Sequence, residues 1–368
     1  MNDFSVVLEQ AQVLTALGDL DATTQSLIHG ACALRPGPCF GADSAFAPFP
    51  DEKCRRLRCA ASRLASSLGV RLQNNGSTVF INCIAKGDIH SLEEVVGGNA
   101  SHVDLPPLVD RQAQEACAAM GLKPSHIISI SNACASGAIA VERAKELLEE
   151  RRYDCAVLFG IESICAFVAS GFNALAALSR HGARPFDAKR DGLSLGEAAA
   201  LAVLSYRPAV KGDIVISGAG SSNDANHRTG PSRTGEGLLR AARAALNDAS
   251  MEPGDIGAVK CHGTATQYND TMEAKALRGI FGGSCPPCAS FKGAIGHTSG
   301  AGSLVEILIA SRCLARKTLP PTAGYALHGV DEKITLSSAP QPIAAPSILC
   351  LSAGFGGVNA AVIISEAQ

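Results

Sequence analysis

Short apolar runs alternate along the chain with segments of helical periodicity. The apolar runs have the length of buried strands and lie at residues 79–84, 127–131, 155–161, 198–204, 214–217, 256–260 and 348–351. Segments with apolar residues at helical spacing lie at 108–120, 139–150, 237–248, 271–280 and 303–314. Continuous apolar runs are typical of strands covered on both faces. The order therefore predicts an α/β protein with largely buried sheets.

A stretch rich in Gly, Ser, Asn, Thr and Pro separates two such series at residues 218–235. Residues of these types favour turns and loops, so we place a boundary near residue 222. The prediction is an N-terminal half at residues 1–222 and a C-terminal half at residues 223–368. The apolar stretch at 344–364 holds a proline and three glycines, which favours buried strands joined by a glycine turn over a membrane span.

Composition agrees with a packed, globular chain. Of the 368 residues, 46% are hydrophobic and 18% are charged, which is too apolar for a disordered protein. The formal net charge is −2 and the basic residues are scattered, so a nucleic-acid-binding surface is not expected. Residues 1–6 do not have the pattern of a secretory signal, and we expect a cytoplasmic protein without a membrane span.

The sequence contains 14 cysteines, and several of them lie inside apolar runs. In a large chain without secretory features, most are expected to be small buried hydrophobic residues. Cys285 and Cys288 have the spacing of a redox pair or of half a zinc site. No second pair with ligand spacing accompanies them, so no metal site is predicted and their role stays open.

One cysteine has the setting of a nucleophile. Residues 126–131 read as a buried strand, Cys134 lies in the turn that follows, and a helix comes next. At a helix start, the macrodipole would favour the thiolate and the backbone N–H could bind an acyl oxygen. From Cys134 alone, one more buried cysteine is the simpler interpretation, but the small residues around it leave room for a substrate.

Two histidines lie in turns marked by glycine. His262 follows a short apolar run and precedes Gly263, and His297 lies between Gly296 and Gly300. A single histidine is usually structural. Two of them, together with the strand, Cys134 and helix, suggest a site in which each imidazole donates a hydrogen bond to a developing enolate oxygen.

At this point the sequence resembles the β-ketoacyl-acyl carrier protein synthases of the thiolase superfamily, specifically the elongating class with one Cys and two His. The resemblance runs in order from about residue 70 to the end. It is carried by Asn132-Ala-Cys-Ala-Ser-Gly137, Arg184-Pro-Phe-Asp-Ala-Lys-Arg-Asp-Gly192 with Gly196-Glu197, His262-Gly-Thr-Ala-Thr266, Lys292 with Gly296-His297, and Gly354-Phe-Gly-Gly-Val-Asn359.

The resemblance implies a thiolase-like fold, with two similar α/β halves in a layered α-β-α-β-α core. It implies that Cys134 in the N-terminal half accepts an acyl group. His262 and His297 in the C-terminal half would promote decarboxylation of malonyl-acyl carrier protein and hold the enolate. The chain is thus expected to be an acyltransferase of fatty-acid or polyketide/polyene biosynthesis. Relatives that prime from acyl-CoA carry Cys, His and Asn instead.

Other roles follow from the same resemblance. Lys292 would organise the site together with Glu273, and Phe355 would contribute an oxyanion N–H and gate the pocket. No cofactor or metal is implied. The implied partners are an acyl carrier protein bearing acyl and malonyl groups, and a second subunit in a homodimer or in a heterodimer with a related ketosynthase.

Further positions are also similar to the family pattern, and some depart from it. Asp270, Asp224 and His227 fall at family-like positions, although loop capping is an equally good interpretation. Residues 41–104 are shorter than in typical members, and Ala176 stands where some relatives carry a basic residue for carrier docking. These departures leave partner recognition less defined than the chemistry.

Two alternatives remain at this stage. The chain could be a thiolase-like acyltransferase that uses CoA thioesters without decarboxylation. It could also be a non-catalytic chain-length partner of another ketosynthase, but such partners usually lack the nucleophilic cysteine that is present here at Cys134. The glycine-rich segments lack the strand and helix context of a dinucleotide site, so NAD is not expected.

Overall fold

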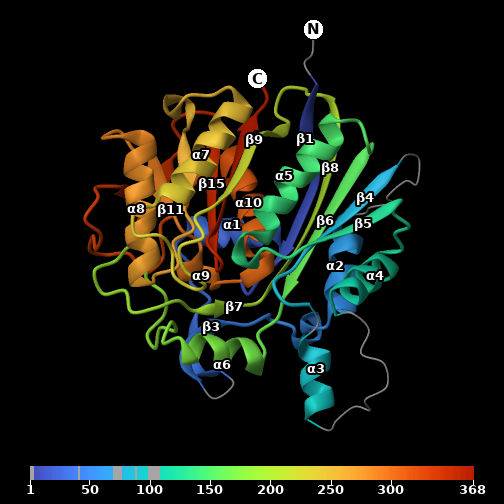
Figure 1. Cartoon of the computed structure of the whole chain (residues 1–368), viewed down its shortest axis with the longest axis horizontal. Coiled ribbons are helices and arrows are strands. Elements are labelled where there is room, and N and C mark those ends of the chain that lie inside the picture. Colours follow the sequence, from blue (N-terminus) through green and yellow to red (C-terminus); the bar gives the residue numbers. More distant parts are fainter. Residues whose placement is uncertain (1–3, 40–41, 69–76, 88, 98–107) are drawn as a thin grey trace.

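The computed structural model describes residues 4–39, 42–68, 77–87, 89–97 and 108–368. Within these residues, strands from both ends of the sequence join in one 11-stranded sheet in the order β13-β11-β10-β15-β16-β9-β1-β8-β6-β4-β5. The two halves of the sheet meet at β9 and β1, which are paired at one position only, Val7 with Val215. The sheet is therefore best described as two half-sheets (Figure 1).

The elements up to residue 208 build the first half-sheet and its helices. They are β1 (Phe4–Leu14), α1 (Leu20–Ile28), β2 (Arg35–Cys39), β3 (Ala42–Ala47), η1 (Glu52–Arg55), α2 (Leu57–Leu68), β4 (Thr78–Cys83), α3 (Ile89–Val96), α4 (Leu108–Met120), β5 (His126–Ile130), η2 (Ala133–Ala135), α5 (Ser136–Glu149), β6 (Cys155–Glu162), α6 (Ala166–Ala174), β7 (Leu195–Gly196) and β8 (Ala198–Pro208).

The elements from residue 214 onward build the second half-sheet. They are β9 (Ile214–Asn223), α7 (Glu236–Ala249), η3 (Pro253–Asp255), β10 (Ala258–Lys260), α8 (Gln267–Phe281), β11 (Pro287–Ala289), α9 (Lys292–Ile295), α10 (Ser299–Ala315), β12 (Thr318–Leu319), β13 (Thr335–Leu336), β14 (Gln341–Pro342), β15 (Ser347–Gly354) and β16 (Val358–Glu366).

The two half-sheets have the same topology. The first has the order β1-β8-β6-β4-β5. Strand β8 is antiparallel to both of its neighbours, β1 and β6, whereas β4 is parallel to both of its neighbours, β6 and β5. The second repeats this order as β9-β16-β15-β10-β11, with the same directions. The prediction of two similar α/β halves is confirmed. The division at residue 222 stays a prediction.

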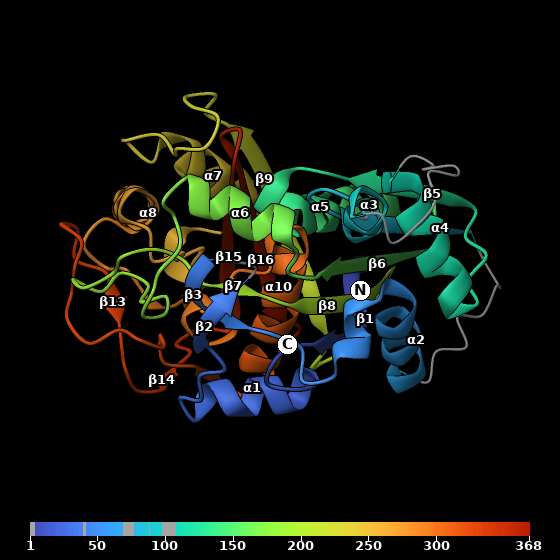
Figure 2. The same cartoon turned by 90° about the horizontal axis from the view of Figure 1, so that it is seen from below.

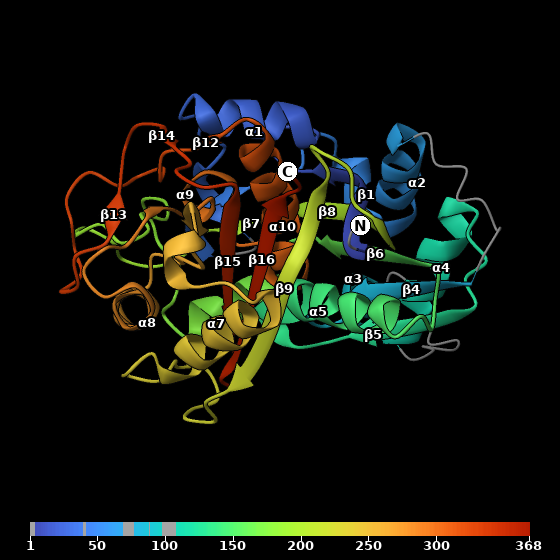
Figure 3. The same cartoon turned by 90° about the horizontal axis from the view of Figure 1, so that it is seen from above.

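Strand side chains alternate between the two faces of each half-sheet and so fill separate cores. On β8, Ala200 and Ala202 face the central core, whereas Leu201 faces the outer core beneath α2 and α4. On β16, Val362 faces the central core and Ile363 the outer core beneath α7 and α8. Helices α5 and α10 lie in the central core, and the result is a five-layered α-β-α-β-α arrangement (Figures 2 and 3).

Helices α5 and α10 are topological equivalents, since each follows the third strand, in chain order, of its five-stranded half-sheet: β5 in the first half and β11 in the second. They pack directly against each other where Gly137 lies on α5. A Cβ atom added there would lie 2.3 Å from the backbone nitrogen of Leu304 on α10. The absence of a side chain at Gly137 thus permits the close approach of the two central helices.

The apolar runs and helical patterns of the sequence correspond to real elements. The seven runs fall on β4, β5, β6, β8, β9, β10 and β15, and the five helical patterns fall on α4, α5, α7, α8 and α10. The stretch at 344–364 forms β15 and β16 joined by a glycine turn. Residues 41, 69–76, 88 and 98–104 of the segment interpreted as shortened lie outside the described residues.

No helix in the described part of the chain combines the length and the apolar character that a transmembrane helix needs.

Candidate active site

Cys134 lies in the short η2 turn between β5 and α5, just before the N-terminus of the central helix α5. The turn requires a left-handed residue, and Ala133 adopts φ 49°. The hydroxyl of Ser136 stabilises the turn because its oxygen accepts a hydrogen bond from the Asn132 N–H at 2.8 Å. The same oxygen lies 2.8 Å from the carbonyl oxygen of Ile84. The predicted order of strand, turn and helix around the cysteine is confirmed, but the expectation of a buried strand is wrong, because β5 is an edge strand whose residues are exposed or half-buried.

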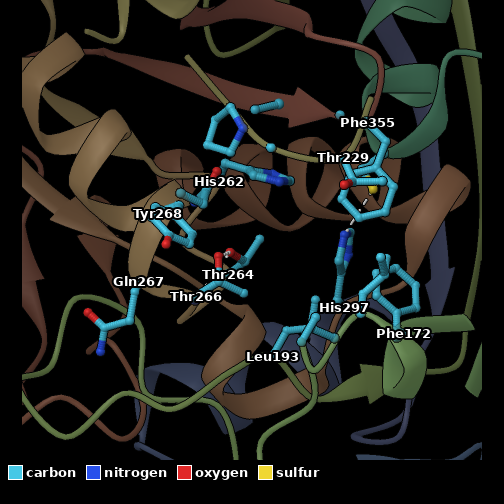
Figure 4. Close-up of a pocket in the computed structure, with 18 of the residues that line it drawn as sticks. Phe172, Leu193, Thr229, His262, Thr264, Thr266, Gln267, Tyr268, His297 and Phe355 are labelled. Carbon is cyan, nitrogen blue, oxygen red and sulfur yellow. Dashed lines mark hydrogen bonds between the residues drawn. The ribbon is translucent and has the colours of Figure 1, made fainter. Parts of the chain in front are cut away.

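His297 lies in the equivalent turn of the second half, just before α10, and its Nε2 lies 3.0 Å from Sγ of Cys134 (Figure 4). Backbone hydrogen bonds connect the loop that carries His297 to the residues in and just before β7. The N–H of His297 donates to the carbonyl of Ser194 at 2.6 Å, and its own carbonyl accepts from Gly196 at 3.1 Å. Gly296 is in the left-handed region and touches Leu195, so a larger residue would displace this loop.

His262 follows β10, and its ring faces His297 across the pocket. The two ring centroids are 5.6 Å apart and the planes are nearly perpendicular, at 86°. Glu273 on α8 holds the loop, since its two carboxylate oxygens accept the N–H groups of His262 at 2.6 Å and Gly263 at 2.7 Å. The carbonyl of Gly263 accepts a hydrogen bond from the Ser290 hydroxyl at 2.8 Å. The three predicted side chains therefore converge.

A buried ion cluster lies behind the histidines. Glu306 on α10 accepts Nζ of Lys292 at 2.5 Å and Nζ of Lys260 at 2.7 Å. Lys260 also donates to the carbonyl oxygen of Leu351 at 2.6 Å. All three charged side chains are almost completely buried. Lys292 thus pairs with Glu306, whereas Glu273 bonds to backbone, and the predicted joint role of Lys292 and Glu273 stays a prediction.

The surroundings favour neutral histidines. Burial, together with the positive charge of Lys292, lowers the pKa of His297 to about 3 and the pKa of His262 well below its usual value. Burial raises the pKa of Cys134 to about 11, although Lys292 opposes this shift. The expectation that the helix start favours the thiolate is not met in the resting site, because desolvation outweighs it. The resting pair is a thiol beside a neutral imidazole.

Burial also raises the pKa of Glu273 to about 7, although the N–H of Gly263 acts against this shift. The pKa of Lys292 is lowered, again chiefly by burial, with Glu306 opposing. Glu306 itself has a lowered pKa because the two lysines outweigh its desolvation. The carboxylate of Glu306 therefore supplies the negative charge that compensates the buried ammonium groups of Lys260 and Lys292.

The cysteine and both histidines line a pocket of about 420 Å³. Phe355, which is 38% exposed, lies beside Phe172 of α6 with 5.8 Å between the ring centroids. Both rings line the pocket, as Figure 4 shows. Thr264 and Thr266 supply polar groups on the opposite side. The predicted gate and oxyanion roles of Phe355 stay predictions, but its side chain is placed on the wall.

The other family-like positions have different surroundings. Asp270 is buried and accepts the N–H groups of Phe186 at 2.6 Å and Ala265 at 3.2 Å, as expected of a residue that shapes loops. Asp224, His227 and Ala176 line the pocket.

The sequence interpretation missed Glu306, Lys260 and Phe172. A signal was present for the first two, because Glu306 is the only acidic residue in α10 and Lys260 ends an apolar run. A single charge in an apolar segment usually marks a buried ion pair. Phe172 had no such signal.

Comparison with known proteins supports this description. Residues 119–208 match the family model of the β-ketoacyl synthase N-terminal domain, and residues 214–326 match that of the C-terminal domain. The chain is similar to a 3-oxoacyl-[acyl-carrier-protein] synthase 2 from Rhizobium meliloti, with 36% identity over 259 residues. The alignment covers 66% of this chain and 60% of the relative, so the chain spans less than two thirds of that protein's length.

Two solved structures are similar over nearly the whole chain. A β-ketoacyl synthase from Burkholderia phymatum has a TM-score of 0.87 at 25% identity, and the comparison covers 100% of both chains. A ketosynthase in complex with its chain length factor from Xenorhabdus doucetiae has a TM-score of 0.83 at 26% identity, covering 99% of this chain and 98% of the other.

The duplicated halves, with a cysteine and a histidine at the starts of their two central helices, define a thiolase-like fold of the ketosynthase type. The predicted fold class is thereby confirmed in its detail. The chain belongs to the β-ketoacyl synthase family.

Proposed function

We propose that this protein is a β-ketoacyl synthase that condenses a Cys134-bound acyl chain with malonyl-acyl carrier protein, with loss of CO₂. The observation that carries the proposal is the 3.0 Å contact between Cys134 Sγ and His297 Nε2, with His262 facing the same pocket. Membership in the family supports it, as does the likeness to the 3-oxoacyl-[acyl-carrier-protein] synthase 2 of Rhizobium meliloti.

In the first step, Cys134 attacks the acyl thioester of the carrier protein. The C–S bond to the enzyme forms, and the carrier thiol leaves. His297 Nε2 is placed to accept the proton of the Cys134 thiol and to return it to the leaving sulfur. Because the pKa of the thiol is raised by burial, proton removal by His297 is expected to accompany the attack rather than to precede it.

In the second step, malonyl thioester loses CO₂ and the negative charge moves to the thioester oxygen. Neutral His262 can donate an N–H to this oxygen, and His297 can do so after it shifts from the tautomer used in the first step to the one with its proton on Nε2; neither removes a proton from carbon. The enolate carbon then attacks the acyl thioester on Cys134 and releases its sulfur as a thiolate, which takes up a proton from solvent. Removal of one such donor typically costs about 10²- to 10³-fold in rate. No metal or nucleotide enters these steps.

The remaining site residues are assigned roles around these steps. Lys292 and Glu273 would position the histidine loops, Lys292 through the charge cluster and Glu273 through the His262 backbone. Phe355 would gate the pocket mouth with Phe172 and supply a backbone N–H to the acyl oxygen.

The decisive experiment supplies purified protein with an acyl-carrier protein and malonyl-carrier protein and measures β-ketoacyl product by mass spectrometry. We expect product with the wild type and with Cys59→Ala, a matched change outside the pocket, and none with Cys134→Ala. Acyl transfer without β-ketoacyl product would instead favour the rival thiolase-like acyltransferase. An acyl adduct that survives Cys134→Ala would overturn the nucleophile assignment.

We also propose that the protein works as a dimer, either with itself or with a related ketosynthase. In the described part of the chain, β5 is the last strand of the sheet, and Ile127 on it is 42% exposed. An apolar edge strand of this kind is suited to strand pairing with a second subunit. The Xenorhabdus ketosynthase occurs with a chain length factor. Light scattering of the protein alone, and after co-expression with a related ketosynthase, would distinguish the two assemblies.

The proposed setting is the cytoplasm, where carrier-protein-dependent synthesis takes place. Cell fractionation with antibody detection tests this, and recovery of the protein with membranes would contradict it.

A further inference from the structure

Three cysteines gather beside the histidine loop, outside the pocket. Cys261 follows β10, Cys288 lies in the neighbouring strand β11, and Cys285 lies in the loop that leads into β11. The sulfur atoms of Cys285 and Cys288 are 3.5 Å apart. Cys288 pairs across the sheet with Val259 of β10, two residues before Cys261. The CPPC motif of the sequence is therefore folded with its two thiols in contact.

The two members of the motif differ in access. Cys285 is partly exposed and follows the exposed residues 282–284, whereas Cys288 and Cys261 are completely buried. The hydrogen bond from Cys288 lowers the pKa of Cys285, while Cys261 and Cys285 together raise the pKa of Cys288 well above its usual value. An accessible thiol of lowered pKa beside a buried partner is the arrangement of an attacking and a resolving cysteine.

A metal site is the other chemistry that such spacing suggests. In the part of the chain that the structure describes, no group of three or more His, Cys, Asp or Glu side chains has the arrangement needed to hold a metal ion. We therefore consider the cysteines as thiols.

We propose that Cys285 and Cys288 form a reversible disulfide by exchange with a low-molecular-weight disulfide such as oxidised glutathione. The Cys285 thiolate, having lost its proton to solvent, attacks one glutathione sulfur. A mixed disulfide forms, and the first glutathione leaves as a thiolate that takes up a proton. Cys288 then loses its proton and attacks the Cys285 sulfur, and the second glutathione leaves in the same way. Two protein thiols are oxidised, and one glutathione disulfide is reduced to two thiols.

This modification has a short path to the active site. The sulfur atoms must move from 3.5 Å apart to about 2.05 Å. The movement involves Cys288 of β11, which pairs with Val259 of the neighbouring strand β10, and β10 leads directly into Cys261 and His262. The N–H of Cys261 donates to the carbonyl of Ala289 at 2.8 Å, so β11 and the His262 loop are linked by backbone as well. Disulfide formation is expected to shift His262 and to lower turnover.

The test uses the full chain carrying Cys134→Ala, which removes the reactive active-site thiol. The protein is equilibrated in mixtures of reduced and oxidised glutathione, alkylated, digested and mapped by mass spectrometry. We expect a peptide with an internal Cys285–Cys288 disulfide, formed reversibly as oxidised glutathione increases. Addition of Cys288→Ser should leave glutathione bound to Cys285, and addition of Cys285→Ser should abolish both products.

Two comparisons keep the result interpretable. Cys261→Ser should retain the Cys285–Cys288 disulfide, and exposed Cys32 reports that the glutathione mixture is reactive. The proposal fails if Cys285 stays fully alkylated in mixtures that modify Cys32, or if the disulfide that forms joins Cys261 to Cys288. Circular dichroism of each variant verifies that it is folded.

The effect on turnover rests on the proposed condensing activity and is measured separately, with Cys134 intact. Oxidised protein should condense several-fold more slowly than reduced protein, and Cys285→Ser should lose less activity than the wild type at the same glutathione ratio while keeping the activity of the reduced wild type. Unchanged turnover despite complete disulfide formation would remove the link to His262. A reduced protein without any condensation would count against the proposed function and leave the disulfide result standing.

Discussion

Glu306→Gln is the substitution for which the structure gives the sharpest energetic expectation. The change preserves shape but removes the one carboxylate that contacts Lys260 at 2.7 Å and Lys292 at 2.5 Å. At an effective dielectric constant of about 20, each attraction amounts to roughly 6 kcal/mol. Much of this is offset by the cost of desolvating the charges. Loss of one partner from a buried cluster costs about 3–5 kcal/mol, because uncompensated charge remains inside.

The pH dependence of the variant has a defined sign. Without Glu306, burial lowers the pKa of both lysines in the folded state below the value in the unfolded chain. The unfolded state then binds more protons, so the stability of the variant rises as pH increases toward the unfolded lysine pKa. The stability deficit relative to the wild type should therefore be largest near pH 7 and should shrink by pH 9.5.

Equilibrium urea unfolding at several pH values measures this deficit. Glu146→Gln is the matched control, since it removes the same group from the exposed pair with Arg143 and should cost less than about 1 kcal/mol. A Glu306→Gln protein that loses no more stability than the control, or a deficit that does not change with pH, would refute the reasoning.

Three further outcomes are expected. Alkylation of Cys134 by iodoacetamide, followed by peptide mass spectrometry, should accelerate about tenfold per pH unit between pH 7 and 10 because the pKa is about 11; a plateau below pH 8 would show that the thiolate already dominates. Gly137→Ala should lower the melting temperature, since overpacking costs about 1–3 kcal/mol, whereas Gly171→Ala, in open space on α6, should not. Phe355→Ala should speed modification of Cys134 by a bulky maleimide several-fold more than modification by iodoacetamide, and equal acceleration of both reagents would argue against a gate.

Much of the fold could be predicted from apolar runs, but not all of it. Strand β4 and the first seven residues of β8 are buried on both faces, so their sequences are mostly apolar. Strand β1 is different, because its middle part is less buried than its neighbours and contains Glu9, Gln10 and Gln12. Strand β11 has three residues, which is too short to give a periodic signal. Such elements are specified by their neighbours in the sheet rather than by their own pattern.

The site residues that could be predicted are those whose reactive side chain and turn-forming neighbours lie in one short segment of the sequence. Cys134, His262 and His297 each stand at a turn with small residues, and such turns are readable from a single segment. The partners of the ion cluster are not, because Lys260 and Glu306 are 46 positions apart. The ionisation of Cys134 was also misjudged, since the helix start is visible in sequence but the depth of burial is not.

The placement of Cys134 and His297 on equivalent turns of the two halves means that neither half possesses a reaction centre by itself. Cutting the backbone in the short connection between β8 and β9, where Val210 is exposed, would yield two inert fragments. Because α5 and α10 meet through their own packing surfaces, the fragments are expected to reassemble and regain acyl transfer when mixed. Reconstitution of this kind would make the family a candidate scaffold for split reporters of protein association.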